Sequence, residues 1–350
     1  MKKTIKRVVC VAILLGCIQL SGCNSVNDKL TKTQLGMNSI EQLDYEGALS
    51  YFDEAESGGE DKELLYRGRG MAYMGIADYT KAIKNFELAL TQANGKVSDL
   101  EYDISYYLAT ALYKSGDLDG TIDTYTAILN LKPKSADAYC LRGRVRLEKG
   151  LYDDAVRDFN SAVSYDKNNP DMYVRIFESM EENGFKEQGH DYLDQAMKLD
   201  TKITDFQKGK LYYCLEDYEN ARDCLEKAKK TDEDGVVLYL GRTYQALGDM
   251  NYAASLYKAY LEKNGDDVTI CNQLGLCQLA NKKYEDALAA FEKGLEVENS
   301  NMLQSLKYNQ IVAYEYMANF KKAAVLMESY LKLYPDDKVA KREYEFLKTR

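Results

Sequence analysis

Small and large apolar residues alternate along the chain with a helical period. From Asn27 onward, nine small residues are each followed four positions later by a large apolar one, so each pair shares one face of a helix. The small residues, spaced 32 to 39 positions apart, are Ala48, Ala82, Thr121, Ala155, Gly189, Ala221, Ala253, Ala287 and Ala323. The large residues, called knobs below, are Phe52, Phe86, Tyr125, Phe159, Leu193, Leu225, Tyr257, Phe291 and Met327. This spacing predicts about nine helical repeats.

A second small residue precedes the first by twelve positions in seven of the nine units. These residues are Gly36, Gly70, Ala109, Gly143, Gly209, Gly241 and Gly275. Two small residues facing each other would let antiparallel helices approach closely, which predicts a helical hairpin in each unit. Phe177 and Ile311 stand at this position in the other two units, and Tyr260 and Tyr330 replace a small residue late in the second helix. These departures predict splayed or shifted hairpins.

Turn-forming residues separate the predicted helices. Aspartates occur where the second helix of a hairpin should begin, and their carboxylates can accept hydrogen bonds from the free backbone N–H groups there. They are Asp44, Asp78, Asp117, Asp217 and Asp249. Pro133, Pro170 and Pro335 mark boundaries between units, because proline interrupts a helix.

The repeat resembles the tetratricopeptide repeat family, whose signature places small and aromatic residues at a period of about 34 residues. Residues 116–125, continuing to Lys132-Pro133, and residues 283–291 follow that signature closely. The resemblance implies an all-α fold, a right-handed α-α superhelix of about nine helical hairpins over residues 29–337. Residues 338–350 are expected to form a capping helix.

The amino terminus has the parts of a secretory signal. Basic residues precede an apolar run from Val8 to Leu20, and this run of about 13 residues is shorter than the about 20 that span a bilayer. It ends in Leu20-Ser21-Gly22-Cys23, which resembles the bacterial lipobox. The resemblance implies acylation of the Cys23 sulfur and cleavage before this residue. Residues 1–22 would be removed, and residues 23–28 would form a lipidated tether.

Two alternatives to a Cys23 anchor stay open. Leu14-Leu15-Gly16-Cys17 offers a competing lipidation position after a shorter apolar run. Alternatively, the signal could be an ordinary cleaved one, in which Cys23 has no role in anchoring.

An anchor at Cys23 predicts where the protein lies. With two acyl chains, the protein would stay on a bilayer for long times. The expected location is therefore the extracytoplasmic face of a bacterial cell membrane, or the periplasmic side of an outer membrane.

Charge narrows the range of partners. Without residues 1–22, the chain keeps 42 Lys and Arg against 56 Asp and Glu, a net charge of −14. An acidic exterior repels nucleic acid and anionic lipid headgroups, so neither is expected as a partner. The partners that remain are envelope or exported proteins and peptides.

The cysteines beyond Cys23 do not resemble a disulfide framework. They have no CxxC motif and no paired spacing, which favours small buried apolar residues on helix faces. They are Cys140, Cys214, Cys224, Cys271 and Cys277. A bridge from Cys214 to Cys224 across one hairpin is the local pairing left open.

No catalytic signature occurs in the sequence. His190, the single histidine, lies beside Gly189 without the cysteines or carboxylates that a metal site or a catalytic triad needs. It is interpreted as a solvated surface residue. Motifs of phosphate loops, serine hydrolases and zinc proteases are also missing. We therefore expect no enzymatic activity, no metal, no cofactor and no small-molecule substrate.

In the resembled family, the first helix of each hairpin lines a concave, peptide-binding surface. Mapped onto this sequence, that surface would be a basic, tyrosine-rich stripe suited to carboxylates and extended peptides. Its candidate residues are Arg67, Tyr106, Tyr107, Tyr113, Lys114, Arg144, Arg175, Glu178, Lys210, Tyr213, Tyr239 and Arg242. The alternative is that the cations pair with carboxylates on adjacent helices, namely Glu148, Glu178, Glu181 and Glu182. The Lys and Asn set with which the family clamps a terminal carboxylate is not found in successive units.

Together these features predict a membrane-anchored scaffold or adaptor of the bacterial envelope. A receptor for acidic or extended peptides is an alternative of another class. A regulatory subunit of a cell-wall enzyme, or of a secretion or pilus assembly, is a third.

Overall fold

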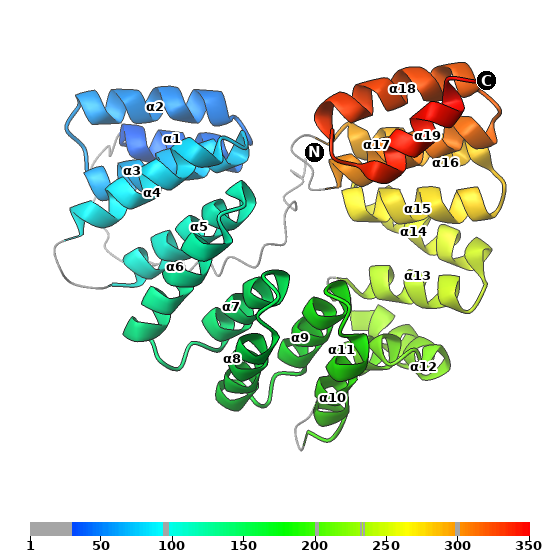
Figure 1. Cartoon of the computed structure of the whole chain (residues 1–350), viewed down its shortest axis with the longest axis horizontal. Coiled ribbons are helices and arrows are strands. Elements are labelled where there is room, and N and C mark those ends of the chain that lie inside the picture. The colour runs from blue at the N-terminus through cyan, green and yellow to red at the C-terminus, as the bar shows by residue number, and fades with distance from the viewer. Residues whose placement is uncertain (1–29, 94–97, 200–202, 232, 234, 298–301) are drawn as a thin grey trace. The chain divides into compact units, whose positions relative to one another are not determined.

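A computed structural model of the chain describes residues 30–93, 98–199, 203–231, 233, 235–297 and 302–350. Cys23 and the predicted segments 1–22 and 23–28 lie outside these residues. All secondary structure in the described part is helical, which confirms the predicted all-α class (Figure 1). None of the described helices is both long and apolar enough to cross a bilayer.

The helices, in chain order, are α1 (Lys32–Glu41), α2 (Tyr45–Ser57), α3 (Lys62–Gly75), α4 (Tyr79–Gln92), α5 (Asp99–Ser115), α6 (Leu118–Leu131), α7 (Ala136–Glu148), α8 (Tyr152–Tyr165), α9 (Pro170–Glu182), α10 (Lys186–Met197), α11 (Asp205–Cys214), α12 (Tyr218–Ala228), the short 3₁₀ helix η1 (Lys229–Thr231), α13 (Val236–Ala246), α14 (Met250–Asn264), α15 (Val268–Ala280), α16 (Tyr284–Leu295), α17 (Leu303–Tyr316), α18 (Phe320–Leu333) and α19 (Lys338–Leu347).

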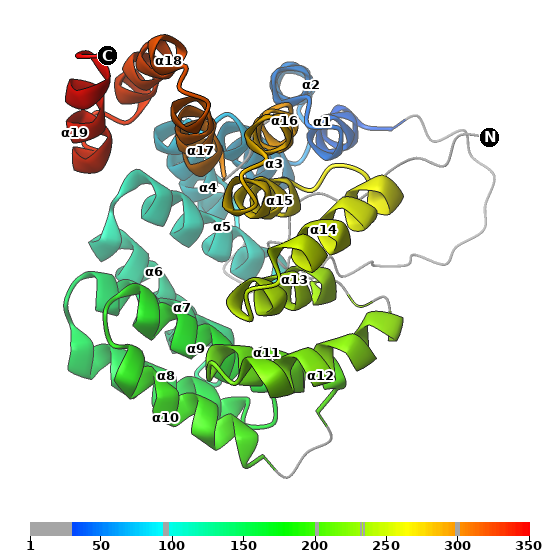
Figure 2. The same cartoon turned by 90° about the vertical axis from the view of Figure 1, so that its right-hand side faces the viewer.

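These helices form two compact units. The N-terminal unit contains the five hairpins α1–α10, and the C-terminal unit contains four hairpins and α19. Each odd-numbered first helix pairs with the even-numbered second helix after it, and consecutive hairpins of a unit pack against each other (Figures 1 and 2). The nine predicted hairpins are therefore present in the described residues. One continuous solenoid over residues 29–337 stays a prediction.

Each hairpin closes around the knob of its second helix. All nine knobs are at most 5% exposed, and the nine small residues four positions earlier are buried. A Cβ atom on Gly275 would lie 2.2 Å from Cε1 of Phe291, and one on Gly241 would lie 2.2 Å from Cζ of Tyr257. A Cβ atom on Gly143 would also lie 3.2 Å from the backbone oxygen of Ala155, the small residue of the second helix, as predicted. The first-helix glycine makes room for the knob.

The fifth hairpin compensates for its missing small residue. Phe177 of α9 is buried, and the residue opposite it on α10 is Gly189. A Cβ atom on Gly189 would lie 3.1 Å from the Phe177 ring and 3.3 Å from Cβ of Met180. Because Gly189 has no side chain, it leaves room for the Phe177 ring, a compensation that was not predicted from the sequence.

The hairpin turns share one geometry. The five predicted aspartates each accept a hydrogen bond from the backbone N–H three residues later, as Asp117 does from Gly120 at 2.9 Å, and these caps are confirmed. In all nine hairpins, the residue just before the N-cap of the second helix has a positive φ. Gly116, at φ 86°, adopts this left-handed conformation readily, whereas five of the turns place a non-glycine residue there.

The five cysteines are buried as thiols, which confirms their interpretation as small buried residues. Burial raises the pKa of Cys140 and of Cys271 to about 11 and that of Cys277 to about 12. Since the thiolate is the reactive form, these three side chains are poor nucleophiles. The bridge between Cys214 and Cys224 is not formed.

The final helix covers the last hairpin. Ala340 and Leu347 of α19 are buried in one cluster with Met327 and Tyr330 of α18. Asp337 caps α19 by accepting hydrogen bonds from two backbone N–H groups, at 3.0 and 2.9 Å. The apolar face that α17 and α18 would otherwise expose is thereby partly buried.

Glu315 of α17 makes this region sensitive to pH. Its Oε1 atom is buried without a hydrogen-bond partner among the described atoms. Burial, together with the charge of Glu343 on α19, raises the pKa of Glu315 from 4.5 to about 7. Between these values the folded chain keeps a proton that the unfolded chain releases, so stability falls as the pH rises through this window.

We expect Glu315→Gln to remove this penalty. Above pH 7, the free energy of unfolding should rise by on the order of 1 kcal/mol, a figure discounted for the partial solvent exposure of the carboxyl. Chemical denaturation at several pH values measures this change. Glu345→Gln, an exposed carboxylate of the same region that is paired with Lys348, is the matched control. A pH dependence unchanged in Glu315→Gln would contradict the assignment.

Candidate functional site

The predicted groove residues all lie on first helices, divided between the two units. The N-terminal unit carries five of the nine principal candidates. They are Arg67 on α3, Tyr106 and Tyr113 on α5, Arg144 on α7 and Arg175 on α9. The C-terminal unit carries the other four on α11 and α13, namely Lys210, Tyr213, Tyr239 and Arg242. A single stripe running through both units stays a prediction.

In the N-terminal unit, each candidate arginine is paired with a carboxylate of a neighbouring first helix. The pairs, with their N–O distances, are Arg67–Asp103 at 2.6 Å, Arg144–Glu182 at 3.2 Å and Arg175–Asp137 at 2.8 Å. Glu182 was among the partners predicted by the alternative interpretation. The Arg144–Glu182 and Arg175–Asp137 pairs are exposed, and because exposed ion pairs contribute at most about 1 kcal/mol, their main effect is to neutralise the cations.

The tyrosines of this unit also make contacts between repeats. The Tyr106 hydroxyl lies 3.0 Å from Oγ of Ser135, and the Tyr113 hydroxyl donates to Glu148 of α7. The Tyr107 ring stacks on Phe86 with centroids 5.6 Å apart. Most of the polar groups expected to meet a ligand in the N-terminal unit therefore already have partners within the stack.

The C-terminal unit brings aromatic rings of α11 and α13 together. Tyr239 contacts Phe206 and Tyr213 edge to face, at centroid distances of 5.9 and 5.5 Å. The ammonium group of Lys210 lies 5.4 Å from the Phe206 centroid and 5.5 Å from the Tyr239 centroid. We call Phe206, Lys210, Tyr213 and Tyr239 the aromatic cluster. Phe206 was missed from the sequence, although its position four residues before Lys210 places it on the same face of α11.

Arg242 adds a cation beside the aromatic cluster. It lies on α13 three residues after Tyr239, which puts both side chains on one face of the helix. Its side chain is half-buried, and it makes no ion pair or hydrogen bond with any residue that the structure describes. This distinguishes Arg242 from the three paired arginines of the N-terminal unit.

The environment of His190 differs from the predicted one. The ring is half-buried and stacks on Phe177, with centroids 5.5 Å apart and planes inclined by 12°. Its Nε2 atom is buried without a hydrogen-bond partner in the described part of the chain. The prediction of a solvated histidine is therefore wrong, because Gly189 and Phe177 draw the ring into the hairpin. Within the described ranges, no three His, Cys, Asp or Glu residues are grouped to hold a metal.

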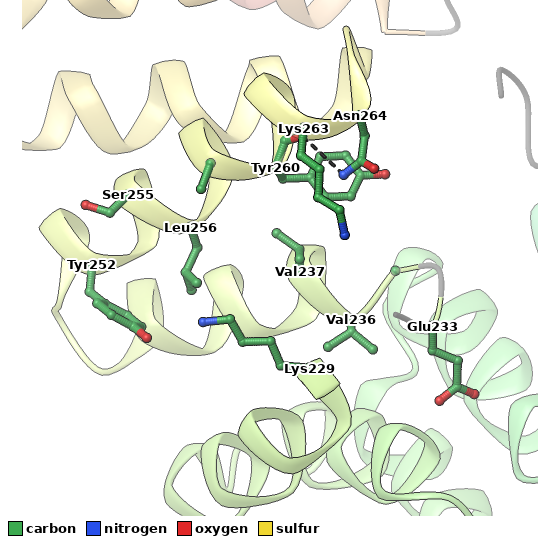
Figure 3. A pocket seen from close by; sticks show the side chains of 12 residues that line it. Lys229, Glu233, Val236, Val237, Tyr252, Ser255, Leu256, Tyr260, Lys263 and Asn264 are labelled. Carbon is green, nitrogen blue, oxygen red and sulfur yellow. Dashed lines mark hydrogen bonds between the residues drawn. The ribbon is translucent and has the colours of Figure 1, made fainter. Parts of the chain in front are cut away.

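A depression of about 340 Å³ lies where α13 and α14 meet η1. Figure 3 shows Val236, Val237 and Leu256 in its wall, with Lys229 and Lys263 among the lining side chains. Tyr260 also lines it, at the position where the sequence departs from the repeat. A second depression of about 310 Å³ lies between α1 and α3 and includes Arg67. Neither contains a residue of the aromatic cluster.

A stack of helical hairpins that presents side chains on its first helices is typical of α-helical repeat proteins that bind other proteins. Two tetratricopeptide repeat models match the sequence, one over residues 67–136, 106–173 and 238–300, the other over residues 206–234. These matches cover more than half of the chain. The chain belongs to the tetratricopeptide repeat family, whose members bind other proteins or peptides.

Among curated relatives, TPR repeat-containing protein MJ1428 of Methanocaldococcus jannaschii is 24% identical over 330 residues, covering 79% of this chain and 57% of the relative. The Hsp70-Hsp90 organizing protein of Triticum aestivum is 23% identical over 277 residues, covering 78% and 41%. The chain thus spans about half the length of these relatives. A solved tetratricopeptide repeat protein from Parabacteroides merdae aligns with a TM-score of 0.48 and 14% identity, over 72% of this chain and 98% of that one.

Proposed function

We propose that this protein is a lipid-anchored scaffold on the extracytoplasmic face of a bacterial membrane. It recruits other proteins by binding an extended peptide on the first helices of its C-terminal unit. The lipobox-like residues 20–23 support the anchor. Arg242 beside the aromatic cluster is the observation that carries the binding proposal.

The chemistry of this surface selects a class of peptide. A guanidinium group binds a carboxylate through two parallel hydrogen bonds, and Arg242 has no carboxylate partner among the described residues. The edge-to-face rings of Phe206, Tyr213 and Tyr239 hold one another in place, so little side-chain entropy is lost on binding. The preferred ligand is an extended segment with an acidic side chain or a terminal carboxylate next to an apolar side chain.

Affinity capture from envelope extracts tests the proposal. We expect Arg242→Ala in the full chain to lower the recovery of its partner by about tenfold or more, as truncation of a central interface arginine typically does. Arg144→Ala is the matched control, because Arg144 is already paired with Glu182. Equal losses from the two variants would contradict a site at the aromatic cluster.

The anchor is tested by fractionation in the same experiment. Cys23→Ser should appear as unprocessed or released protein, whereas Cys17→Ser should remain in the membrane fraction. An unchanged membrane fraction for Cys23→Ser would exclude the anchor without affecting the binding result.

A further inference from the structure

The first hairpin and the last segment of the chain carry opposite charges. Residues 32–57 contain one basic and six acidic side chains, whereas residues 318–350 contain eight basic and five acidic ones. The chain as a whole has a net charge of −10. Residues 318–350 are therefore a positive region on an acidic protein.

In the positive region, one guanidinium group lies over two aromatic rings. Phe320 of α18 meets Phe346 of α19 edge to face, with centroids 6.5 Å apart. The guanidinium group of Arg350 lies 4.8 Å from the Phe346 centroid and 5.9 Å from that of Phe320. Lys321 and Lys322 follow Phe320 and are exposed. We call these five residues the basic end, and Phe346 remains 43% exposed within it.

The cations of the basic end are not neutralised within the described structure. None of Lys321, Lys322 and Arg350 forms an ion pair with a described carboxylate. By contrast, nearby Lys332 pairs with Glu328 at 3.1 Å, and Lys348 pairs with Glu345 at 2.6 Å. The basic end therefore combines a partly exposed aromatic ring with three cations that have no ion-pair partner among the described residues.

The turn between α1 and α2 carries exposed negative charges and an exposed apolar side chain, and so complements the basic end. Glu41 and Glu46 flank it, both are exposed, and neither forms an ion pair with a described cation. Leu43, between them, is 37% exposed and has a φ of 63°. We call Glu41, Leu43 and Glu46 the acidic end.

We propose that the basic end of one copy of this protein binds the acidic end of a second copy. Opposite charges attract across such a contact, and like ends repel each other, which disfavours pairing of two identical ends. Packing of Phe346 against Leu43 would also bury apolar surface that is now exposed to water, which favours the contact. Because the two surfaces differ, the contact is heterologous, and the joined pair retains one free basic end and one free acidic end for further growth.

Cysteine cross-linking in intact cells tests this proposal on the full chain. Gln42→Cys and Thr349→Cys place exposed thiols next to the acidic and basic ends without removing a charge. Treatment with a short bismaleimide should convert the double variant into a ladder of dimers, trimers and higher species. Each single variant should stay monomeric, because like ends do not meet. The parent chain is the background control, and the raised pKa values of Cys140, Cys271 and Cys277 keep its reaction low.

Charge reversal separates a specific contact from crowding at the membrane. In the double-cysteine chain, we expect Lys321→Glu with Lys322→Glu to reduce the ladder by at least about tenfold, and Glu41→Lys with Glu46→Lys to do the same. All four reversals in one chain should restore it, and Lys84→Glu, an exposed lysine on α4, should leave it unchanged.

Four outcomes would overturn the proposal. These are the absence of a ladder, a dimer formed by a single variant, a cross-link within one chain, and a ladder insensitive to the reversals.

Discussion

Replacing Asp158 with alanine is expected to lower the free energy of unfolding of the N-terminal unit by about 3–5 kcal/mol, because it leaves buried charges without their partner. Asp158 of α8 is 2% exposed. Its carboxylate accepts from Nε and Nη2 of Arg142, at 2.9 and 2.7 Å, and from Nη1 of Arg146, at 2.7 Å. Nη1 of Arg142 donates to Thr126 of α6 at 2.9 Å, so the network joins three helices.

Urea denaturation followed by far-ultraviolet circular dichroism measures the loss. Asp154→Ala on the same helix is the control, because Asp154 pairs with Arg157, a largely exposed side chain. That variant should lose at most about 1 kcal/mol. Similar losses from the two variants would show that the Asp158 network contributes no more than a surface ion pair.

Replacing the knob Phe291 with alanine should lower the free energy of unfolding of the C-terminal unit by about 3–5 kcal/mol, the usual cost of emptying a fully buried aromatic site. Val325→Ala, on an exposed side chain of the same unit, should change it by less than about 0.5 kcal/mol. Denaturation of both variants under identical conditions makes this comparison.

The partner of this knob gives a sharper test of the packing. Gly275→Ala alone should destabilise the unit by about 1–3 kcal/mol, because the added methyl group would overlap the Phe291 ring. Combined with Phe291→Leu, it should cost less than the sum of the two single changes, because the smaller leucine side chain frees part of the space that the added methyl group needs. If the losses in the free energy of unfolding were additive, the side chains at positions 275 and 291 would not compete for the same space.

Features that depend on residues close in sequence could be predicted from the sequence. The pairing of Ala287 with Phe291 follows from the four-residue spacing on a helix face, and the aspartate caps follow from hydrogen bonds that span three residues. The hairpins, their number and the buried cysteines follow from the same local periodicity. The depressions at α13–α14 and α1–α3 could not be predicted in this way, because their walls depend on how separate helices pack against each other.

Interactions between helices were decided by the tertiary structure. The sequence predicts a basic stripe, yet Arg144 and Arg175 are paired with carboxylates 38 residues away, whereas Arg242 has no such partner among the described residues. The binding assignment of the candidate residues stays a prediction, as does the anchor at Cys23.

By itself, the sequence determined the repeat, the helical class and the family, because each rests on contacts within a turn or two of helix. Only the tertiary structure decided that glycines face knobs, that His190 is drawn against Phe177, and that Asp158 is buried between Arg142 and Arg146. The reason is that the register between two helices depends on all the side chains packed between them, and no local period encodes it.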